Sequence, residues 1–103
     1  MKDEINLKTI SFKLVETVEM LGKKLSEFYK TELEYTSTYN KNVLKSGMAS
    51  QPLREAEAME TLKLDPIYEK YHTLKLEIKL LYMRKDIYVE ISRNIRNLAF
   101  NDI

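Results

Sequence analysis

The chemistry available to this sequence is limited first by its ionisable and nucleophilic side chains. His72 is the only histidine among 103 residues, and the chain has no cysteine. The segment EKYH places Glu69 three residues before His72, which is the ligand spacing of di-iron helical bundles. Such a centre needs this motif on two helices and further glutamates on the facing ones. Because the motif occurs once and has no counterpart in the first half of the chain, we expect no metal site and no cofactor.

Nucleophilic or acid–base catalysis has little to draw on. A serine-histidine-aspartate arrangement would need His72 with a distant serine, and the chain has no nucleophile-elbow glycine motif. The two glycines are 25 residues apart, so a glycine-rich phosphate loop is also excluded. Carboxylate pairs such as Glu55 with Glu57, or Asp86 with Glu90, are equally typical of a solvated helix face. We therefore interpret the chain as a non-enzymatic protein with no catalytic residues.

Nucleic-acid binding is the third kind of chemistry, and the stretch LYMRKDIYVEISRNIRNLAF (81–100) has the residue types for it. Single strands are held in basic grooves with aromatic side chains, on which each stacked base contributes roughly 1–3 kcal/mol. The stretch also fits the wet side of a helix, because Glu90 precedes Arg93 by three residues and can pair with it. Both interpretations stay open. The basic residues that would bind phosphates are Arg54, Lys79, Arg84, Lys85, Arg93 and Arg96.

The composition indicates which elements carry these residues. Two glycines, two prolines and 32% charged residues are typical of long helices. The formal net charge is +1, so no overall electrostatic field favours nucleic acid or an anionic membrane. The first residues, MKDEINLKTISFK, do not have the pattern of a signal peptide, and no apolar stretch approaches the roughly 18 residues of a membrane span. Together with the absence of cysteine, this predicts a soluble protein of the cytoplasm.

Apolar residues recur at spacings of three and four, a pattern that predicts an amphipathic first helix over about 4–45. The segment YTSTYN (35–40) is poor in helix formers, so the continuity of this helix stays open. We expect Gly47 to cap its C-terminal end, because glycine accepts the left-handed backbone that such caps use.

Two further helices follow. Pro52 suits the first turn of a short helix over about 52–63. An Asp-Pro pair (65–66) then provides the cap and first residue of a last helix over about 66–98. With no internal repeat, the sequence predicts one all-α domain over 1–103.

Two long helices joined by a short helical elbow are expected to fold back into an antiparallel hairpin with coiled-coil packing. Val18 and Leu98 belong to the apolar series that should line the seam. The residues expected to form the seam and to hold an oligomer together are Leu14, Leu21, Leu25, Phe28, Leu74, Ile78, Leu81, Tyr88, Ile91 and Ile95.

A second apolar set falls off this seam in the last helix. Because exposed contiguous apolar area usually marks an interface, we expect a homo-oligomer, most simply a dimer in the form of a four-helix bundle. The residues of this second set are Tyr68, Leu76, Leu80, Tyr82, Met83, Ile87 and Val89.

The segments PLREAEAME and LDPIYEKYHTLKLEIKLLYMRKDIYVEISRNIR together resemble small helical proteins encoded among the early replication and recombination genes of tailed phages. In these an Arg-Glu-Ala-Glu-like segment and a short linker precede a long, basic last helix. The layout is also similar to that of recombination mediators, which are helical oligomers that bind single-stranded DNA and help to load a recombinase. The resemblance covers Pro52–Arg96. It implies contact with single-stranded DNA and with a recombinase or single-strand-binding protein, in the cytoplasm of the phage host.

Two other functions stay open beside this one. The chain could be a protein-only interaction module, such as a small phage inhibitor or adaptor of a host enzyme or defence complex, or a purely structural coiled-coil subunit. Phosphate contacts would make binding fall steeply with salt, whereas an apolar protein interface would be nearly insensitive to it. A structural subunit would bind neither DNA nor a different protein.

Overall fold

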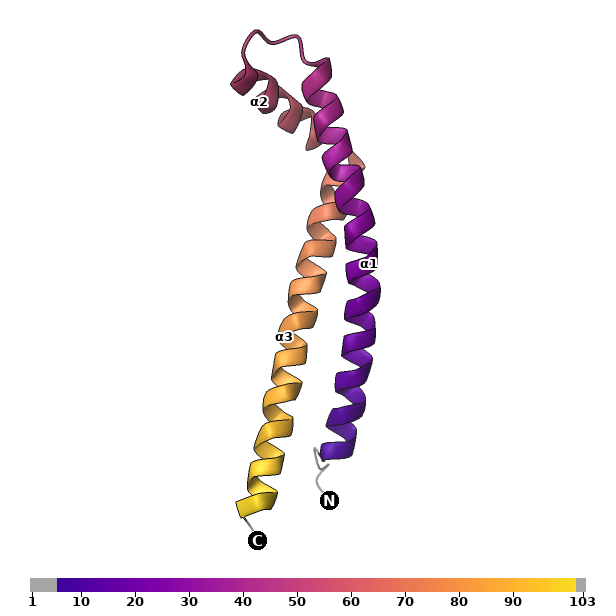
Figure 1. The fold of residues 1–103 in the computed structure, drawn as a ribbon, viewed down its shortest axis with the longest axis vertical. Helices are drawn as coiled ribbons and strands as arrows, with labels where there is room; N and C mark the ends of the chain where they lie inside the picture. The colour runs from indigo at the N-terminus through magenta and orange to yellow at the C-terminus, as the bar shows by residue number, and fades with distance from the viewer. Residues whose placement is uncertain (1–5, 102–103) are drawn as a thin grey trace. The chain divides into compact units, whose positions relative to one another are not determined.

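The computed structural model describes residues 6–101, with side chains up to Leu98, and within this range the regular elements are all helices (Figure 1). Helix α1 spans Leu7–Lys45, α2 spans Gln51–Leu62 and α3 spans Pro66–Asn101. The prediction of an all-α protein is confirmed. Residues 4 and 5, where the first helix was expected to begin, lie outside the described residues. None of the described helices contains a stretch long and apolar enough to cross a membrane.

Helix α1 continues without a break through residues 35–40, the segment for which the sequence left continuity open. Contacts with the rest of the chain stabilise it there. The ring of Tyr35 stacks on that of Tyr71 in α3, with centroids 4.1 Å apart. Two turns later, the side-chain amide of Asn42 donates to the carbonyl oxygen of Ala58 in α2 at 3.4 Å. Packing of a helix face commonly outweighs a weak local propensity, and it does so here.

Side-chain caps explain where α2 and α3 begin. The Ser50 hydroxyl accepts a hydrogen bond from the backbone N–H of Leu53 at 3.4 Å. The Asp65 carboxylate accepts one from the backbone N–H of Ile67 at 2.9 Å. Each cap satisfies a donor that has no partner within the first helical turn. The predicted role of Asp65 at the start of the last helix is confirmed.

The end of α1 differs from the prediction. Gly47 does not adopt a positive φ, so it is not a left-handed cap. Instead, the Ser46 backbone N–H donates to the Val43 carbonyl at 3.2 Å, and the Ser46 hydroxyl accepts from the Met48 N–H at 3.2 Å. The Arg54 guanidinium then donates from Nε to the Met48 carbonyl at 2.8 Å. Hydrogen bonds of Ser46 and Arg54 thus hold the segment that follows α1, where a left-handed glycine cap was expected.

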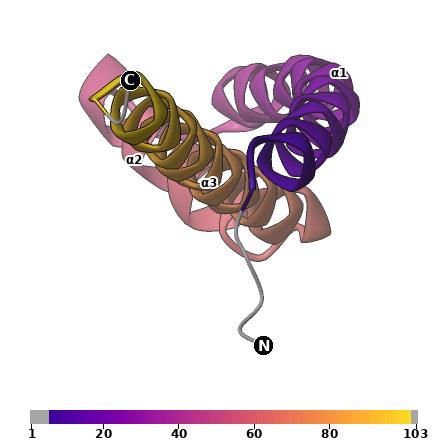
Figure 2. The same cartoon turned by 90° about the horizontal axis from the view of Figure 1, so that it is seen from below.

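The chain divides into two compact units: unit 1 combines Met1–Lys24 with Glu77–Ile103, and unit 2 is Leu25–Leu76. Within unit 1, the first part of α1 lies beside the last part of α3 and runs antiparallel to it (Figures 1 and 2). The buried side chains described in unit 1 are Ile10, Thr17, Leu21, Ile78, Leu81 and Ser92, and those in unit 2 are Thr31, Ala58, Leu62, Ile67 and Leu74.

The covered side chains of both long helices alternate at spacings of four and three. This 3.5-residue period keeps one side of each helix directed at its neighbour. In α1 the series runs Ile10, Leu14, Thr17, Leu21, Lys24, Phe28, Thr31, Tyr35, Thr38 and Asn42, each buried or half-buried. In α3 it runs Ile67, Tyr71, Leu74, Ile78, Leu81, Lys85, Tyr88, Ser92 and Ile95.

This period corrects two assignments made from the sequence. Val18 was expected on the seam, but its side chain is 48% exposed, and buried Thr17 takes the inward position beside it. Leu98 was expected on the seam of the last helix and is 66% exposed. Threonine can take an inward position because its hydroxyl donates to the Lys13 carbonyl at 2.8 Å within the same helix.

Candidate interaction surfaces

The residues predicted to form the seam are covered within a single chain. The contact within the chain therefore accounts for the burial of four of them and leaves the other six partly exposed. Leu21, Leu74, Ile78 and Leu81 are buried, whereas Leu14, Leu25, Phe28, Tyr88, Ile91 and Ile95 are half-buried.

An apolar stripe runs along an exposed face of α3. Its members are Leu76, Leu80, Met83 and Ile87, at spacings of four, three and four, and each side chain is 52–56% exposed. We call this set the α3 stripe. Its exposure confirms the prediction that these residues lie off the seam, and Tyr82 and Val89 of the same predicted set are exposed as well. Tyr68 is the exception, because it is half-buried.

Charged residues border the α3 stripe on both sides. One border consists of Glu77 and Arg84, which directly follow stripe residues in the sequence. The other border consists of Lys79 and Asp86, which directly precede stripe residues. Each border carries one acidic and one basic residue, seven positions apart. Arg84, Lys79 and Asp86 take part in none of the ion pairs found among the described residues.

A shallow hollow in unit 1 lies beside this stripe. Its lining combines Met20 and Lys24 of α1 with Glu77, Leu80 and Arg84 of α3, above buried Leu81. The Lys24 ammonium lies 3.3 Å from the Glu77 carboxylate, through one of the two carboxylate oxygens. Both side chains are partly exposed, so the pair is worth at most about 1 kcal/mol.

A second apolar stripe lies on α1 within unit 1. Val15 and Val18 are 58% and 48% exposed, and the small residues Ser11 and Gly22 continue the same face. A Cβ atom added at Gly22 would meet nothing within 4 Å, so no contact inside the chain requires a glycine there. We call these four residues the α1 stripe.

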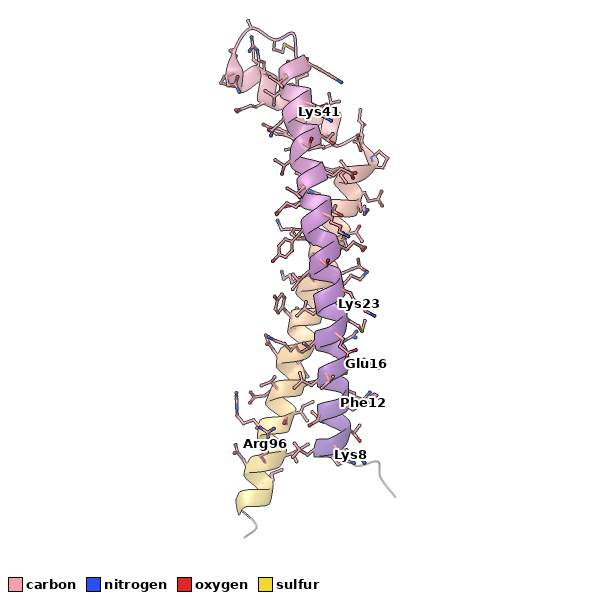
Figure 3. The ribbon with its side chains drawn as sticks, turned by 45° about the vertical axis from the view of Figure 1, so that its right-hand side comes forward. Lys8, Phe12, Glu16, Lys23, Lys41 and Arg96 are labelled. Atoms are coloured by element: carbon pink, nitrogen blue, oxygen red, sulfur yellow. The ribbon has the colours of Figure 1, made fainter. Side chains whose placement is uncertain are left out.

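Phe12 adds an exposed aromatic ring close to the α1 stripe. It lies on the outer side of α1 with Lys8 and Glu16 one turn before and after it (Figure 3). Its side chain is 70% exposed, and it lines an open hollow with neighbouring α1 residues. Aromatic rings in such positions commonly anchor protein interfaces.

Three of the six basic residues predicted to bind phosphates interact with other groups of the chain. Arg54 holds the connection before α2 through its hydrogen bond to Met48. The Arg93 guanidinium pairs with Glu90 at 2.9 Å, as the alternative interpretation of the last helix expected. Lys85 is half-buried, and its ammonium lies 5.2 Å from the centre of the Tyr82 ring.

The helix geometry brings four of these six residues onto one side of α3. At 100° per residue, Lys79, Lys85, Arg93 and Arg96 fall within about a third of the circumference, spread over about 26 Å of helix. Arg84 points to the opposite side, and Arg54 is on α2. The side chain of Phe100, the last residue of the predicted basic and aromatic stretch, lies outside the described residues.

Unit 2 contains an aromatic cluster that sequence reasoning missed. Its rings belong to Phe28 and Tyr35 of α1 and to Tyr68, Tyr71 and His72 of α3, with centroid distances from 4.1 to 6.4 Å. Burial raises the pKa of the Tyr35 hydroxyl, and the nearby Tyr68 and Tyr71 raise it further. The sequence signal was the inward spacing of Phe28, Tyr35 and Tyr71, which does not distinguish a ring cluster from ordinary packing.

Glu69 and His72 are the pair with the spacing of a di-iron ligand motif. In the described part of the chain, no three side chains of histidine, aspartate or glutamate are grouped so that they could hold an ion. His72 instead lies against Tyr68, with ring centroids 4.4 Å apart, and meets Tyr71 edge-on at 5.1 Å.

The chain matches no protein-family model. Comparison with curated proteins and with solved structures also finds no similar protein. The resemblance to phage recombination proteins is therefore still a hypothesis. A functional proposal has to start from the exposed stripes and the basic side of α3.

Proposed function

We propose that this chain is a non-enzymatic helical interaction module that assembles with itself and docks onto a helix of a second protein. The observation that carries the proposal is the pair of exposed apolar stripes, one on α1 and one on α3. A helix with one apolar face for its own chain and another directed at solvent is typical of bundles with more than two helices.

In this proposal the chain forms an antiparallel helical hairpin, with α2 as the elbow between α1 and α3. The four-three spacing of covered residues supports coiled-coil packing of the two long helices. Two such hairpins would form a four-helix bundle, in which the exposed stripes become a second set of seams.

We place the module, on the strength of the resemblance, among phage-encoded accessory proteins of DNA replication or recombination in the host-cell cytoplasm. Its second protein would then be a recombinase or a single-strand-binding protein. A host enzyme or defence complex is the other class of partner that an exposed apolar stripe would suit.

Light scattering tests the assembly directly. At tens of micromolar protein, we expect a mass at least twice 12.2 kDa. Because apolar burial is nearly independent of ionic strength, the mass should change little between about 50 and 500 mM salt. A monomer under both conditions would contradict the proposed function.

A second candidate function is binding of single-stranded DNA. The observation in its favour is the side of α3 along which Lys79, Lys85, Arg93 and Arg96 are spaced, with the exposed Tyr82 ring and one carboxylate, Asp86, among them. Basic side chains interleaved with an aromatic ring suit a flexible strand. Repetition of this side in an oligomer would add weak contacts through multivalency.

Fluorescence anisotropy with a labelled strand of about 30 nucleotides tests this candidate. If the basic side binds phosphates, Arg93→Ala/Arg96→Ala should weaken binding about tenfold, and binding should fall steeply between about 50 and 200 mM salt. Lys8→Ala/Lys23→Ala removes two cations from the outer side of α1 and serves as the matched control (Figure 3). A flat titration at low salt would exclude DNA binding.

A further inference from the structure

We propose that two copies of this chain pair through the α3 stripe, with their α3 helices antiparallel. This inference rests on the proposed function, because it names the partner for one of the two exposed stripes. The stripe lies on α3 alone, and both its apolar residues and its charged borders are complementary to themselves in this arrangement.

The apolar residues form matched layers in an antiparallel pair. When Leu80 of one copy packs against Met83 of the second, Leu76 packs against Ile87 of the second copy in the same register. The two-fold symmetry repeats both contacts, which gives four consecutive apolar layers. These are the four side chains that the isolated chain leaves 52–56% exposed.

The charged borders select the antiparallel orientation. In an antiparallel helix pair each border meets the same border of the partner, whereas in a parallel pair it meets the opposite one. The antiparallel register therefore places Glu77 opposite Arg84 of the second copy. On the other border it places Lys79 opposite Asp86 of the second copy, so symmetry gives four contacts of opposite charge.

A parallel pair has the reverse effect, because it brings Lys79 close to Arg84 of the second copy. The intrachain pair between Lys24 and Glu77 does not prevent the antiparallel contact. Lys24 contacts one Glu77 oxygen at 3.3 Å, and a carboxylate can accept hydrogen bonds at both oxygens.

The contact ends where the stripe becomes polar. The next layer on each side would combine Thr73 with Glu90 of the second copy, and Glu90 already pairs with Arg93 at 2.9 Å. The four border charges sum to zero within one copy, so the stripe offers an anionic strand no electrostatic advantage. A second copy, by contrast, provides an apolar contact in each of the four layers and an opposite charge for each border residue.

Charge reversal tests the pairing. Lys79→Glu should place a new carboxylate opposite Asp86 of the second copy, and Asp86→Lys should place two ammonium groups opposite each other. We expect each single substitution to raise the dimer dissociation constant about tenfold at low salt, because two symmetric contacts change from attraction to repulsion. The double variant, Lys79→Glu/Asp86→Lys, should restore the constant of the wild type.

Sedimentation equilibrium of the full chain measures these constants, and circular dichroism confirms that each variant stays helical. Lys8→Glu makes the same charge change on the outer side of α1 and should leave the constant unaltered (Figure 3). Unchanged constants in the single variants, or a double variant no better than they are, would overturn the pairing.

Cysteine cross-linking tests the orientation, since the chain has no cysteine of its own. A mixture of Leu76→Cys and Ile87→Cys copies should be joined by a thiol cross-linker about 8 Å long. Leu76→Cys copies alone should stay unjoined, because two Leu76 positions are about 16 Å apart along an antiparallel pair. The reverse pattern would show a parallel pair and overturn the proposal.

The two proposals fail in different ways. A wild-type oligomer whose charge variants and cross-links do not behave as expected would overturn pairing through the α3 stripe and leave the interaction module standing. A wild-type monomer at tens of micromolar would contradict both.

Discussion

Leu81→Asp is expected to unfold unit 1 at neutral pH. The Leu81 side chain is 6% exposed in the contact between α1 and α3. The cations nearest to it, Lys24, Arg84 and Lys85, are only half-buried or exposed, so they would not follow a short aspartate side chain into this contact. Placing an unpaired charge there costs several kcal/mol, against a total stability of about 5–15 kcal/mol for a typical domain. Circular dichroism at 222 nm should show a large loss of helix.

The same variant has a defined pH dependence. Burial raises the pKa of a carboxyl above its unfolded value of about 3.9, so the folded state binds the proton more tightly. Stability relative to the wild type should therefore increase as the pH falls from 7 towards about 4.5. Leu33→Asp, at a side chain 74% exposed on α1, is the matched control and should keep its helix content. Equal losses in the two variants would mean that Leu81 does not lie in the core.

Much of the secondary structure follows from the sequence alone. The Asp-Pro pair at 65–66 predicts the start of α3, and the structure places its cap there. The scarcity of glycine and proline predicts long helices, and α1 and α3 have 39 and 36 residues. The off-seam apolar residues of the last helix were also predictable, because they fail to fit the inward spacing.

The inward face of α1 was less predictable, and the reason is physical. A pattern of residue types assigned Val18 to the seam, whereas the structure buries Thr17 and Thr31 and covers part of Lys24. A contact between two helices is narrow, so a hydroxyl bonded to its own helix or a long stem with its charge in water can lie in it. Residue type alone does not reveal these exceptions.

The candidate sites were only partly predictable for a similar reason. The sequence grouped six basic residues as candidate phosphate ligands. Helix geometry places Arg84 on a different side of α3 from the other four, and Arg54 instead donates to the Met48 carbonyl before α2. Whether a cation is free or engaged depends on neighbours that the sequence does not reveal. The Glu90–Arg93 pair was the exception, because a spacing of three residues on one helix predicts it.

Pairing through the α3 stripe would leave the α1 stripe open. Met20 lies beside Leu80 and Arg84, whereas Val18, two residues earlier, points about 160° away from it around α1. A dimer joined at α3 would thus carry two further apolar faces, each next to an exposed Phe12. These faces are where we expect a helix of a second protein to dock.

Leu62→Ala is expected to cause the largest loss of stability among conservative truncations in unit 2. Leu62 is the largest side chain described as fully buried, at 0% exposure, and it ends α2 beside buried Ala58. Removing a buried leucine to alanine typically costs 2–5 kcal/mol, through lost apolar burial and the cavity left behind. Urea denaturation should show this loss as a lower midpoint.

Leu64→Ala is the matched control, because the Leu64 side chain is 87% exposed only two residues later, and its loss should stay within about 0.5 kcal/mol. Hydrogen exchange then locates the effect. Without the Leu62 anchor, amides around Ala58 and Ile67 should exchange faster, whereas those around Leu21 in unit 1 should keep most of their protection. Uniform acceleration in both units would mean instead that the chain unfolds as one cooperative body, with α2 as part of a single core.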